Sequence, residues 1–165
     1  MTAFARIQAK IHTHDSIARQ AEAWHAAGKR IVFTNGCFDL LHYGHLHYLA
    51  EAADLADCLV IGLNSADSVR RLKGPSRPIN DEITRLHALA AMEFVAAVAV
   101  FDEDTPRQLI ERVQPDVLVK GGDWRPEQIV GADWVLARGG KVLSLPFVDG
   151  YSTTALERKI LSAGI

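Results

Sequence analysis

Cysteine is scarce in this sequence, since Cys37 and Cys58 are the only two among 165 residues. Two unpatterned cysteines exclude a disulfide framework and a cysteine-rich zinc site. The chain also lacks a hydrophobic run of the roughly 18 residues that span a membrane, and its first residues lack the apolar core of a signal peptide. These absences predict a cytoplasmic protein that has no membrane partner.

An excess of charge of one sign is also lacking. Lysine and arginine number 18, aspartate and glutamate 20, and the formal net charge is -2. A nucleic-acid or membrane-surface binder needs a basic face, so neither partner is predicted and any anion site must be local. The patterns GxxxxGK[ST] and GxGxxG are missing too, which excludes a P-loop and a dinucleotide fingerprint.

The chain does have a regular alternation of strand-like and helix-like segments. Short β-branched or apolar runs occupy residues 30–34, 58–63, 95–101, 116–119 and 142–145. Strands that alternate with helices indicate a parallel sheet with right-handed crossovers. The pattern predicts an α/β fold, a single doubly wound Rossmann-like domain with a parallel five-stranded sheet. We expect this globular unit over residues 30–165, after an N-terminal helical segment over residues 1–29.

Helix boundaries follow from capping signals. The first long helix is expected over residues 15–27, with Gly28 as its C-terminal cap. Asn80 opens a helix over 80–92, and Thr105 with Gln108 fits a capping box for the segment 105–113. Thr154 with Glu157 fits another capping box near the C-terminus. The basic stretch RRLKGPSR, residues 70–77, is expected to form a mobile loop.

Ligands of doubly wound folds bind beyond the carboxyl ends of the strands, at the switch point of the sheet. The segments that follow the predicted strands there are TNGCFDLLHYGH, NSADS, KGGDW and GYSTT. They carry the polar and glycine residues that a site needs. We therefore expect these segments to meet at one edge of the sheet.

His42 and His45 stand at the start of a predicted helix, where unpaired backbone N–H groups favour an anion. Asn35 and Gly36 form a turn pair whose backbone N–H groups can face a ligand, and Gly44 removes a side chain that would separate the two histidines. The histidines therefore indicate phosphate ligands. Zinc binding and plain capping with packing are the alternatives.

His47 belongs to the polar stripe of the same predicted helix. Glu51 follows one turn later, and this i,i+4 pair is suited to a surface contact. We assign His47 no chemistry.

The stretch FDLLHYGH resembles the HxGH signature of the nucleotidyltransferase superfamily, which includes the cytidylyltransferases. The ordered set NSADSVRRLKG, SRPIN, Arg85, DEDTP, LVKGGDW and DGYSTT is most similar to the adenylyltransferase domain of ADP-heptose synthases. The resemblance extends over residues 30–160. It implies a stand-alone adenylyltransferase, a homo-oligomer (dimer or larger), and a kinase of the same pathway on a separate chain.

This resemblance implies transfer of AMP from ATP to D-glycero-D-manno-heptose 1-phosphate, which gives ADP-heptose and pyrophosphate for the lipopolysaccharide inner core. The attacking phosphate oxygen is already anionic, so in-line attack needs neither a general base nor a covalent intermediate. Mg²⁺ is expected as a cofactor together with ATP. The residues that hold the metal stay open.

The catalytic residues implied are His42, His45 and Lys73. Nucleotide binding is assigned to Asn35, Gly36, Cys37, Phe38, Gly44, Arg85, Lys120, Gly122, Asp123, Tyr151, Ser152 and Thr153. Substrate binding is assigned to Asp39, Asn64, Lys73 and Lys120.

Several of these assignments carry a finer expectation. Arg85 is expected at the leaving group, and Cys37 as a small residue that lines the nucleotide. Asp39 is open between orienting a histidine, holding magnesium through water and stabilising a turn. Trp124 is expected to pack.

Two other functions remain open. A cytidylyltransferase acting on glycerol 3-phosphate or a related alcohol phosphate would share the HxGH core and the STT segment. A non-catalytic nucleotide-binding module would need neither both histidines nor Lys73. Release of pyrophosphate from ATP and a sugar 1-phosphate separates these readings.

Overall fold

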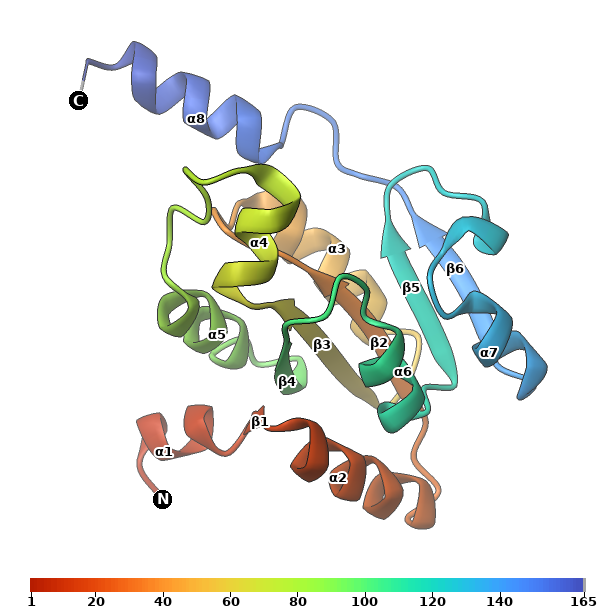
Figure 1. The fold of residues 1–165 in the computed structure, drawn as a ribbon. Coiled ribbons are helices and arrows are strands. Elements are labelled where there is room, and N and C mark those ends of the chain that lie inside the picture. The colour runs from red at the N-terminus through yellow and green to blue at the C-terminus, as the bar shows by residue number, and fades with distance from the viewer. Residues whose placement is uncertain (165) are drawn as a thin grey trace.

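The computed structural model describes residues 1–164 and contains one six-stranded sheet, in the order β1-β4-β3-β2-β5-β6 (Figure 1). Every neighbouring pair of strands runs parallel. The strands are β1 (Ile11–His12), β2 (Ile31–Gly36), β3 (Cys58–Asn64), β4 (Val95–Phe101), β5 (Val117–Gly121) and β6 (Lys141–Leu145).

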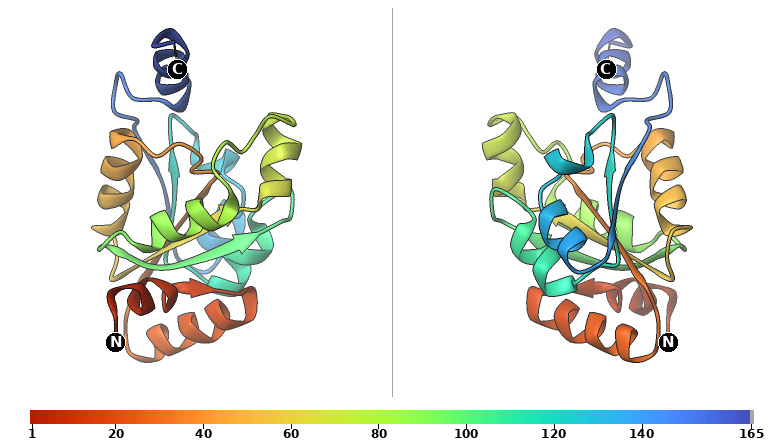
Figure 2. Two further views of the ribbon diagram at one scale, coloured as in Figure 1. Left: turned by 90° about the vertical axis from the view of Figure 1, so that its left-hand side faces the viewer. Right: turned by 90° about the vertical axis from the view of Figure 1, so that its right-hand side faces the viewer.

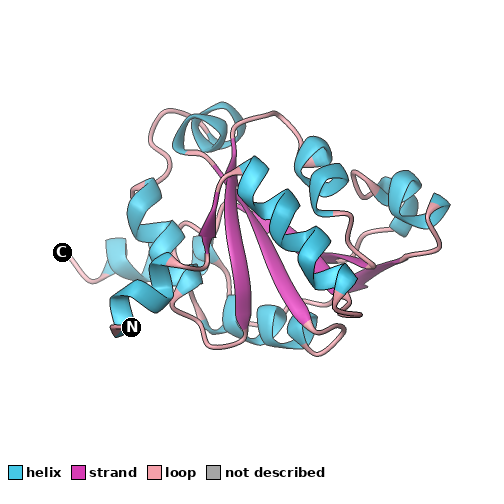
Figure 3. Cartoon of the chain, turned by 90° about the horizontal axis from the view of Figure 1, so that it is seen from below, coloured by secondary structure: helices cyan, strands magenta, loops and turns pink. Residues whose placement is uncertain are grey.

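Helices cover both faces of this sheet (Figures 2 and 3). They are α1 (Ala3–Gln8), α2 (His14–Ala26), α3 (Tyr43–Ala53), α4 (Ala66–Lys73), α5 (Glu82–Ala90), α6 (Arg107–Val113), the 3-10 turn η1 (Pro126–Gln128), α7 (Ala132–Ala137) and α8 (Thr153–Ser162). None of the helices within residues 1–164 is long and apolar enough to cross a membrane.

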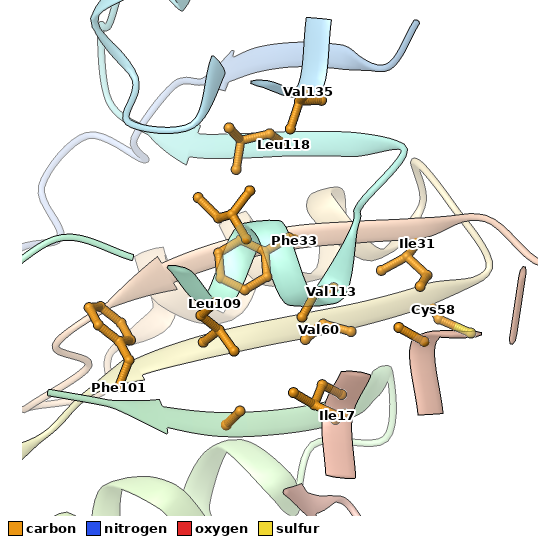
Figure 4. Close-up of a cluster of buried hydrophobic side chains, with 14 of the residues drawn as sticks. Ile17, Ile31, Phe33, Cys58, Val60, Phe101, Leu109, Val113, Leu118 and Val135 are labelled. Atoms are coloured by element: carbon orange, nitrogen blue, oxygen red, sulfur yellow. The ribbon is translucent and has the colours of Figure 1, made fainter. Parts of the chain in front are cut away.

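One hydrophobic core lies between the sheet and helices α2, α6 and α7 (Figure 4). Ile17 of α2 and Leu109 of α6 are buried there against Phe33 and Val60 of the central strands. A second core lies on the opposite face, where Leu49 of α3 and Leu89 of α5 meet the alternate strand residues. Because both faces are covered, all seven residues of β3 are buried, which explains its unbroken apolar sequence.

The side on which successive strands are added to the sheet changes between β2 and β5. From β2 it proceeds through β3 to β4, and it then returns to place β5 on the other side of β2. The crossovers on the two sides of this point lie on opposite faces, as the two cores show. The carboxyl ends of β2 and β5 are therefore the switch point at which doubly wound folds bind ligands.

The structure confirms the predicted Rossmann-like α/β fold and corrects its strand count from five to six. The additional strand is β1, where Ile11 and His12 pair with Val98 and Ala99 of β4. Two residues are too few to produce a recognisable alternation in sequence. The first 29 residues thus contribute a strand as well as helices.

Two local predictions about loops were wrong. Asn35 and Gly36 are not a turn pair, because they end β2 and pair with Gly62 and Leu63 of β3. Residues 70–73 of the predicted basic loop are helical, because α4 extends through Lys73. Most side chains of α4 face solvent, so its sequence is polar, and for this reason the helix was not predicted.

The capping predictions had mixed outcomes. Gly28 follows α2 with φ 73°, as predicted for a residue that ends a helix. The cap of α5 is Asp81 rather than Asn80, and that of α6 is Pro106 rather than Thr105. The cap of α8 is Ser152, whose hydroxyl accepts the N–H of Ala155, so the predicted Thr154 capping box is wrong.

Candidate active site

The two histidines of HYGH lie at the first turn of α3. His42 is its N-cap residue, and the His45 N–H donates to the His42 carbonyl at 2.9 Å. Their imidazole rings stack, with centroids 3.9 Å apart and planes 28° apart. A Cβ on Gly44 would lie 3.1 Å from the His42 ring and 3.2 Å from Cβ of Tyr151. Gly44 therefore leaves the space that the sequence predicted.

Burial keeps both imidazoles neutral. It lowers the pKa of His42, and it lowers that of His45 to about 4, with smaller contributions from His42 and from the ammonium of Lys73. At pH 7 the two rings thus offer N–H donors without a charge. An incoming anion would favour their protonated form.

His45 lines a cavity of about 170 Å³ at the switch point, which we call the histidine cavity. Its walls come from the ends of β2 and β5, the start of α3, the end of α4 and the start of α8. The lining residues are Asn35, Gly36, Cys37, Phe38, Asp39, His45, Tyr48, Lys73, Lys120, Gly121, Phe147 and Thr153.

Two lysines from different elements line the histidine cavity. Lys73 ends α4, and Lys120 lies in β5 next to its last residue. Burial lowers the pKa of Lys120, and the nearby Cys37 partly offsets this effect. Lys120 is half-buried and forms no ion pair with a carboxylate among the described residues, so an anionic ligand would stabilise its charge.

The chain between β2 and α3 bends sharply around the cavity. Phe38 has φ 44°, a left-handed conformation that is unusual for a large residue. Its ring packs edge-on against His45 at 5.5 Å and lies over Gly36, whose added Cβ would be 3.0 Å from the Phe38 ring. Gly36 thus accommodates this ring. Burial raises the pKa of the Cys37 thiol, which disfavours the reactive thiolate.

The carboxylate of Asp39 stabilises a turn in the loop between α4 and α5. This carboxylate accepts N–H groups of Ile79 at 2.9 Å and Asn80 at 2.8 Å, and Arg77 lies 3.1 Å away. Burial would raise the pKa of Asp39, but these bonds and the Arg77 charge outweigh it and the pKa is lowered. Of its three suggested roles, the geometry matches turn stabilisation.

Eight of the predicted site residues do not line the histidine cavity: His42, Gly44, Asn64, Arg85, Gly122, Asp123, Tyr151 and Ser152. Arg85 and Asn64 lie behind its wall. Arg85 is 1% exposed, and its guanidinium donates to the carbonyls of Cys37 at 2.9 Å and Asn64 at 2.8 Å. The Asn64 side chain donates to Ser68 at 3.0 Å. Both residues support the cavity wall from behind.

Of the four basic residues in the stretch 70–77, only Lys73 lines the histidine cavity. Arg70 pairs with Asp67 on the surface. Arg71 pairs with Asp102 at 3.6 Å and Asp104 at 3.2 Å. These surface cations are already paired, so they add little to anion binding in the cavity.

A second cavity of about 190 Å³, which we call the tryptophan cavity, shares Asn35 and Lys120 with the first. Its other lining residues are Pro106, Trp124, Gln128, Ile129 and Val130. Trp124 is 47% exposed, and its Nε1–H donates to the Gly121 carbonyl at 3.2 Å, so the ring packs in part and leaves a face open to the cavity. Two small cavities that share the half-buried Lys120 suit two substrates that react with each other.

The KGGDW and GYSTT segments border these cavities. Gly122 has φ 113°, and its N–H donates to the Leu145 carbonyl at 2.8 Å, while Asp123 is exposed. Thr153 lines the histidine cavity, whereas the Ser152 hydroxyl is used as a helix cap. The ring of Tyr151 packs on Tyr43 at 5.0 Å.

Sequence reasoning missed several cavity walls. Tyr48 and Phe147 line the histidine cavity, and Gln128 and Val130 line the tryptophan cavity. Phe147 had one usable signal, because it follows a predicted strand at the ligand-binding edge.

A larger cavity, of about 510 Å³, lies at the opposite end of the sheet. It is lined by His25, Arg30, Asp116, Arg138 and Lys141 among others, and helices α2, α6 and α7 end beside it. Basic residues at helix C-termini complement the helix dipole. This charge pattern is therefore accounted for without a ligand.

A protein-held metal ion does not fit the described site. Within residues 1–164 no three His, Cys, Asp or Glu side chains gather as a metal-ligand set. The carboxylate of Asp39 is already used by two N–H groups and Arg77.

Comparison with known proteins agrees with this geometry. The family model described as cytidylyltransferase-like matches residues 33–156. The chain is 57% identical over 155 residues to "Bifunctional protein HldE" of Geobacter metallireducens, which covers 94% of this chain and 32% of that protein. It is 54% identical over 157 residues to the protein of the same name from Geotalea uraniireducens. The chain thus spans about a third of the length of these curated relatives.

Two solved structures share the fold. A lipopolysaccharide core biosynthesis protein from Thermoplasma volcanium GSS1 is 30% identical, with a TM-score of 0.59, over 76% of this chain and 100% of that one. A pantoate-beta-alanine ligase from Francisella tularensis is 13% identical, with a TM-score of 0.58, over 94% of this chain and 78% of that one. The second likeness concerns the fold alone. The family match and the identities together show that this chain is a nucleotidyltransferase of the cytidylyltransferase-like family.

Proposed function

We propose that this nucleotidyltransferase transfers AMP from ATP to D-glycero-D-manno-heptose 1-phosphate and forms ADP-heptose and pyrophosphate. The observation that carries the proposal is the stacked His42–His45 pair beside a cavity that Lys73 and Lys120 enter. The HldE name of relatives at 51–57% identity supports the heptose substrate and a place in lipopolysaccharide inner-core synthesis.

The reaction needs charge stabilisation rather than a base. A phosphate oxygen of the sugar 1-phosphate attacks the α-phosphorus of ATP, the bond from that phosphorus to the bridging oxygen breaks, and pyrophosphate leaves. The nucleophile is already an anion at pH 7, so no side chain has to remove a proton from it. His42 and His45 donate N–H groups to the oxygens where negative charge accumulates.

Each cavity takes one substrate in this proposal. The triphosphate occupies the histidine cavity between His45, Lys73 and Thr153. In-line attack requires the acceptor on the side of the α-phosphorus opposite the leaving pyrophosphate. We assign the acceptor to the tryptophan cavity, because it shares Asn35 and Lys120 with the histidine cavity. Lys120 then contacts phosphate oxygens of both substrates. Trp124 offers a flat apolar face to the sugar ring.

Mg²⁺ enters in this proposal as the complex with ATP, because a triphosphate supplies oxygen ligands that the described side chains do not. The bound ion would neutralise phosphate charge. No residue of the chain is assigned to it.

A panel of nucleoside triphosphates against several sugar 1-phosphates, scored by released pyrophosphate, tests the proposal. We expect the fastest release with ATP and the heptose 1-phosphate. Equal or faster release with glucose 1-phosphate would contradict the heptose assignment. A His45→Ala variant is the matched control, and its residual rate should be close to that without enzyme.

A cytidylyltransferase acting on an alcohol phosphate is the second candidate, and the cytidylyltransferase-like description of the family favours it. CTP with glycerol 3-phosphate belongs in the same panel and would identify it. A nucleotide-binding module without activity would bind an ATP analogue and release no pyrophosphate with any acceptor.

A further inference from the structure

Helix α8 projects away from the body of the molecule (Figures 1 and 2). None of its residues from Thr153 to Ser162 is buried. Yet Thr153, in its first turn, lines the histidine cavity. Hydrophobic burial alone cannot hold this end of the helix in place, so specific contacts must fix it.

One ion pair supplies such a contact. Arg77, in the loop after α4, directs Nη2 to Oε1 of Glu157, one helical turn after Thr153. Its other nitrogen, Nη1, lies 3.1 Å from Oδ2 of Asp39. Within residues 1–164, no other side chain of α8 forms an ion pair with the rest of the protein.

The buried Asp39 fixes the side chain of Arg77. The Arg77 side chain is 17% exposed, and that of Asp39 is 1% exposed. Asp39 also accepts the backbone N–H groups of Ile79 and Asn80, so the loop that carries Arg77 is fastened to the chain just before His42. Arg77 thus joins the loop after α4 to two segments that line the cavity, the loop before α3 and the start of α8.

Apolar contact of α8 with the body is small. Leu156 is half-buried and lines a shallow cavity with Phe38 and Leu41, whereas Ile160 and Leu161 are exposed. A few half-buried atoms contribute little to fixing a helix. The Arg77–Glu157 pair is therefore the main polar restraint on the position of Thr153.

We propose that Arg77 is a positioning residue that acts through Glu157 to hold Thr153 at the triphosphate. This rests on the proposed function only in assigning ATP to the histidine cavity. Glu157 also brings a negative charge close to that anion site, and pairing with Arg77 neutralises it. Loss of Arg77 frees α8 and also leaves this charge unopposed, whereas loss of the Glu157 carboxylate frees α8 alone. In both cases Thr153 is no longer held at the triphosphate, so nucleotide binding weakens.

Binding of a non-hydrolysable ATP analogue by calorimetry tests the role of Glu157 without any acceptor. We expect Glu157→Gln to raise the Kd about three- to tenfold, the range for a partly buried ion pair. Arg158→Gln, on the same helix and without an ion pair in the described structure, is the control and should stay within about twofold of the parent. An unchanged Kd for Glu157→Gln would overturn the proposal.

A double-mutant cycle separates positioning from general loss of structure. If Arg77 acts through Glu157, Arg77→Ala combined with Glu157→Gln should bind the analogue no more weakly than Arg77→Ala alone. Arg77→Lys keeps the charge but not the two-pronged geometry, and should restore part of the affinity. Independent, multiplying effects of the two changes would overturn the link.

A failure of the proposed function gives a different experimental result from a failure of the positioning role. Wild-type protein that binds the ATP analogue but releases no pyrophosphate with any sugar phosphate would refute the transferase assignment. The Glu157→Gln and Arg77 measurements would still decide the positioning role, because they need only nucleotide binding.

Discussion

If the triphosphate binds beside His45 as proposed, the protonation of His45 links nucleotide binding to pH. Its pKa in the free protein is about 4, so the ring is neutral at pH 6 to 7. A bound triphosphate raises this pKa, and the complex takes up a proton that the free protein does not hold. The affinity for an ATP analogue should therefore rise as pH falls from 7 to 6, by less than about tenfold for one proton.

Calorimetry in buffers of different ionisation enthalpy measures this proton uptake directly. The nucleotide itself also titrates near pH 6.5, so His45→Asn, which keeps a donor without the titration, provides the baseline. Equal proton uptake in the variant and the parent would refute the role of His45.

Gly44 sets how closely the histidines and the C-terminal loop approach. Its added Cβ would meet the His42 ring at 3.1 Å and Tyr151 at 3.2 Å, so both must shift by a few tenths of an ångström. We expect Gly44→Ala to lower kcat about tenfold, because reacting groups tolerate little misplacement. Gly139→Ala, at a glycine with open space but a positive φ, is the comparison: it should affect the melting temperature rather than kcat.

At the scale of elements, α4 delivers Lys73 from its last turn into the histidine cavity. In the proposed reaction its ammonium stabilises the charge that develops on the phosphates, so Lys73→Ala should reduce kcat about 100-fold while the Kd of an ATP analogue changes less than about threefold. Arg70→Ala removes a cation from the same helix that pairs with Asp67 on the surface, and should leave both constants unchanged. Equal turnover of Lys73→Ala and the parent would remove Lys73 from the mechanism.

Two neighbouring residues at the start of α8, Ser152 and Thr153, have different roles. The Ser152 hydroxyl caps the helix, whereas Thr153 lines the cavity. Thr153→Ala should raise the KM for ATP, and Thr153→Ser should restore it because the hydroxyl returns. An unchanged KM in Thr153→Ala would show that this segment only shapes the helix.

Sequence predicted those elements whose signal is local. The seven apolar residues of β4 gave its bounds, Val95–Phe101, correctly, because a parallel strand covered on both faces is apolar throughout. Helix α4 was missed because its exposed sequence RRLK lacks an apolar stripe. Strand β1 was missed because its two residues are defined by pairing with β4, which depends on the fold and not on local sequence.

The residues of the candidate site also divide into those that local sequence predicted and those that depend on the fold. His45, Lys73, Lys120 and Thr153 belong to motifs that precede or follow regular elements, and the structure brings all of them to one cavity. Phe147 and the walls of the tryptophan cavity depend on the paths of the loops after β5 and β6. Arg85 was assigned to the ligand, and this stays a prediction. Its Nη1 donates to two backbone carbonyls behind the cavity, a contact that only the folded chain reveals, whereas its Nε and Nη2 are buried without a partner among the described residues.

At the scale of the whole molecule, the switch point places two cavities side by side around Asn35 and Lys120. If each cavity holds one substrate, changes in their walls should affect different constants. Trp124 lines only the tryptophan cavity, and Phe147 lines only the histidine cavity. This pair allows the assignment of substrates to cavities to be tested within one protein.

We expect Trp124→Ala to raise the KM for the sugar 1-phosphate about tenfold, the loss of one aromatic contact face, with the Kd of an ATP analogue unchanged. Phe147→Ala should do the opposite, because its ring borders the triphosphate side and is 63% exposed, so its removal leaves the core intact. Initial rates at varied acceptor and direct binding of the analogue measure the two effects. If Trp124→Ala weakens the nucleotide and spares the acceptor, the substrates occupy the cavities in the reverse order, and Lys120 still lies between them.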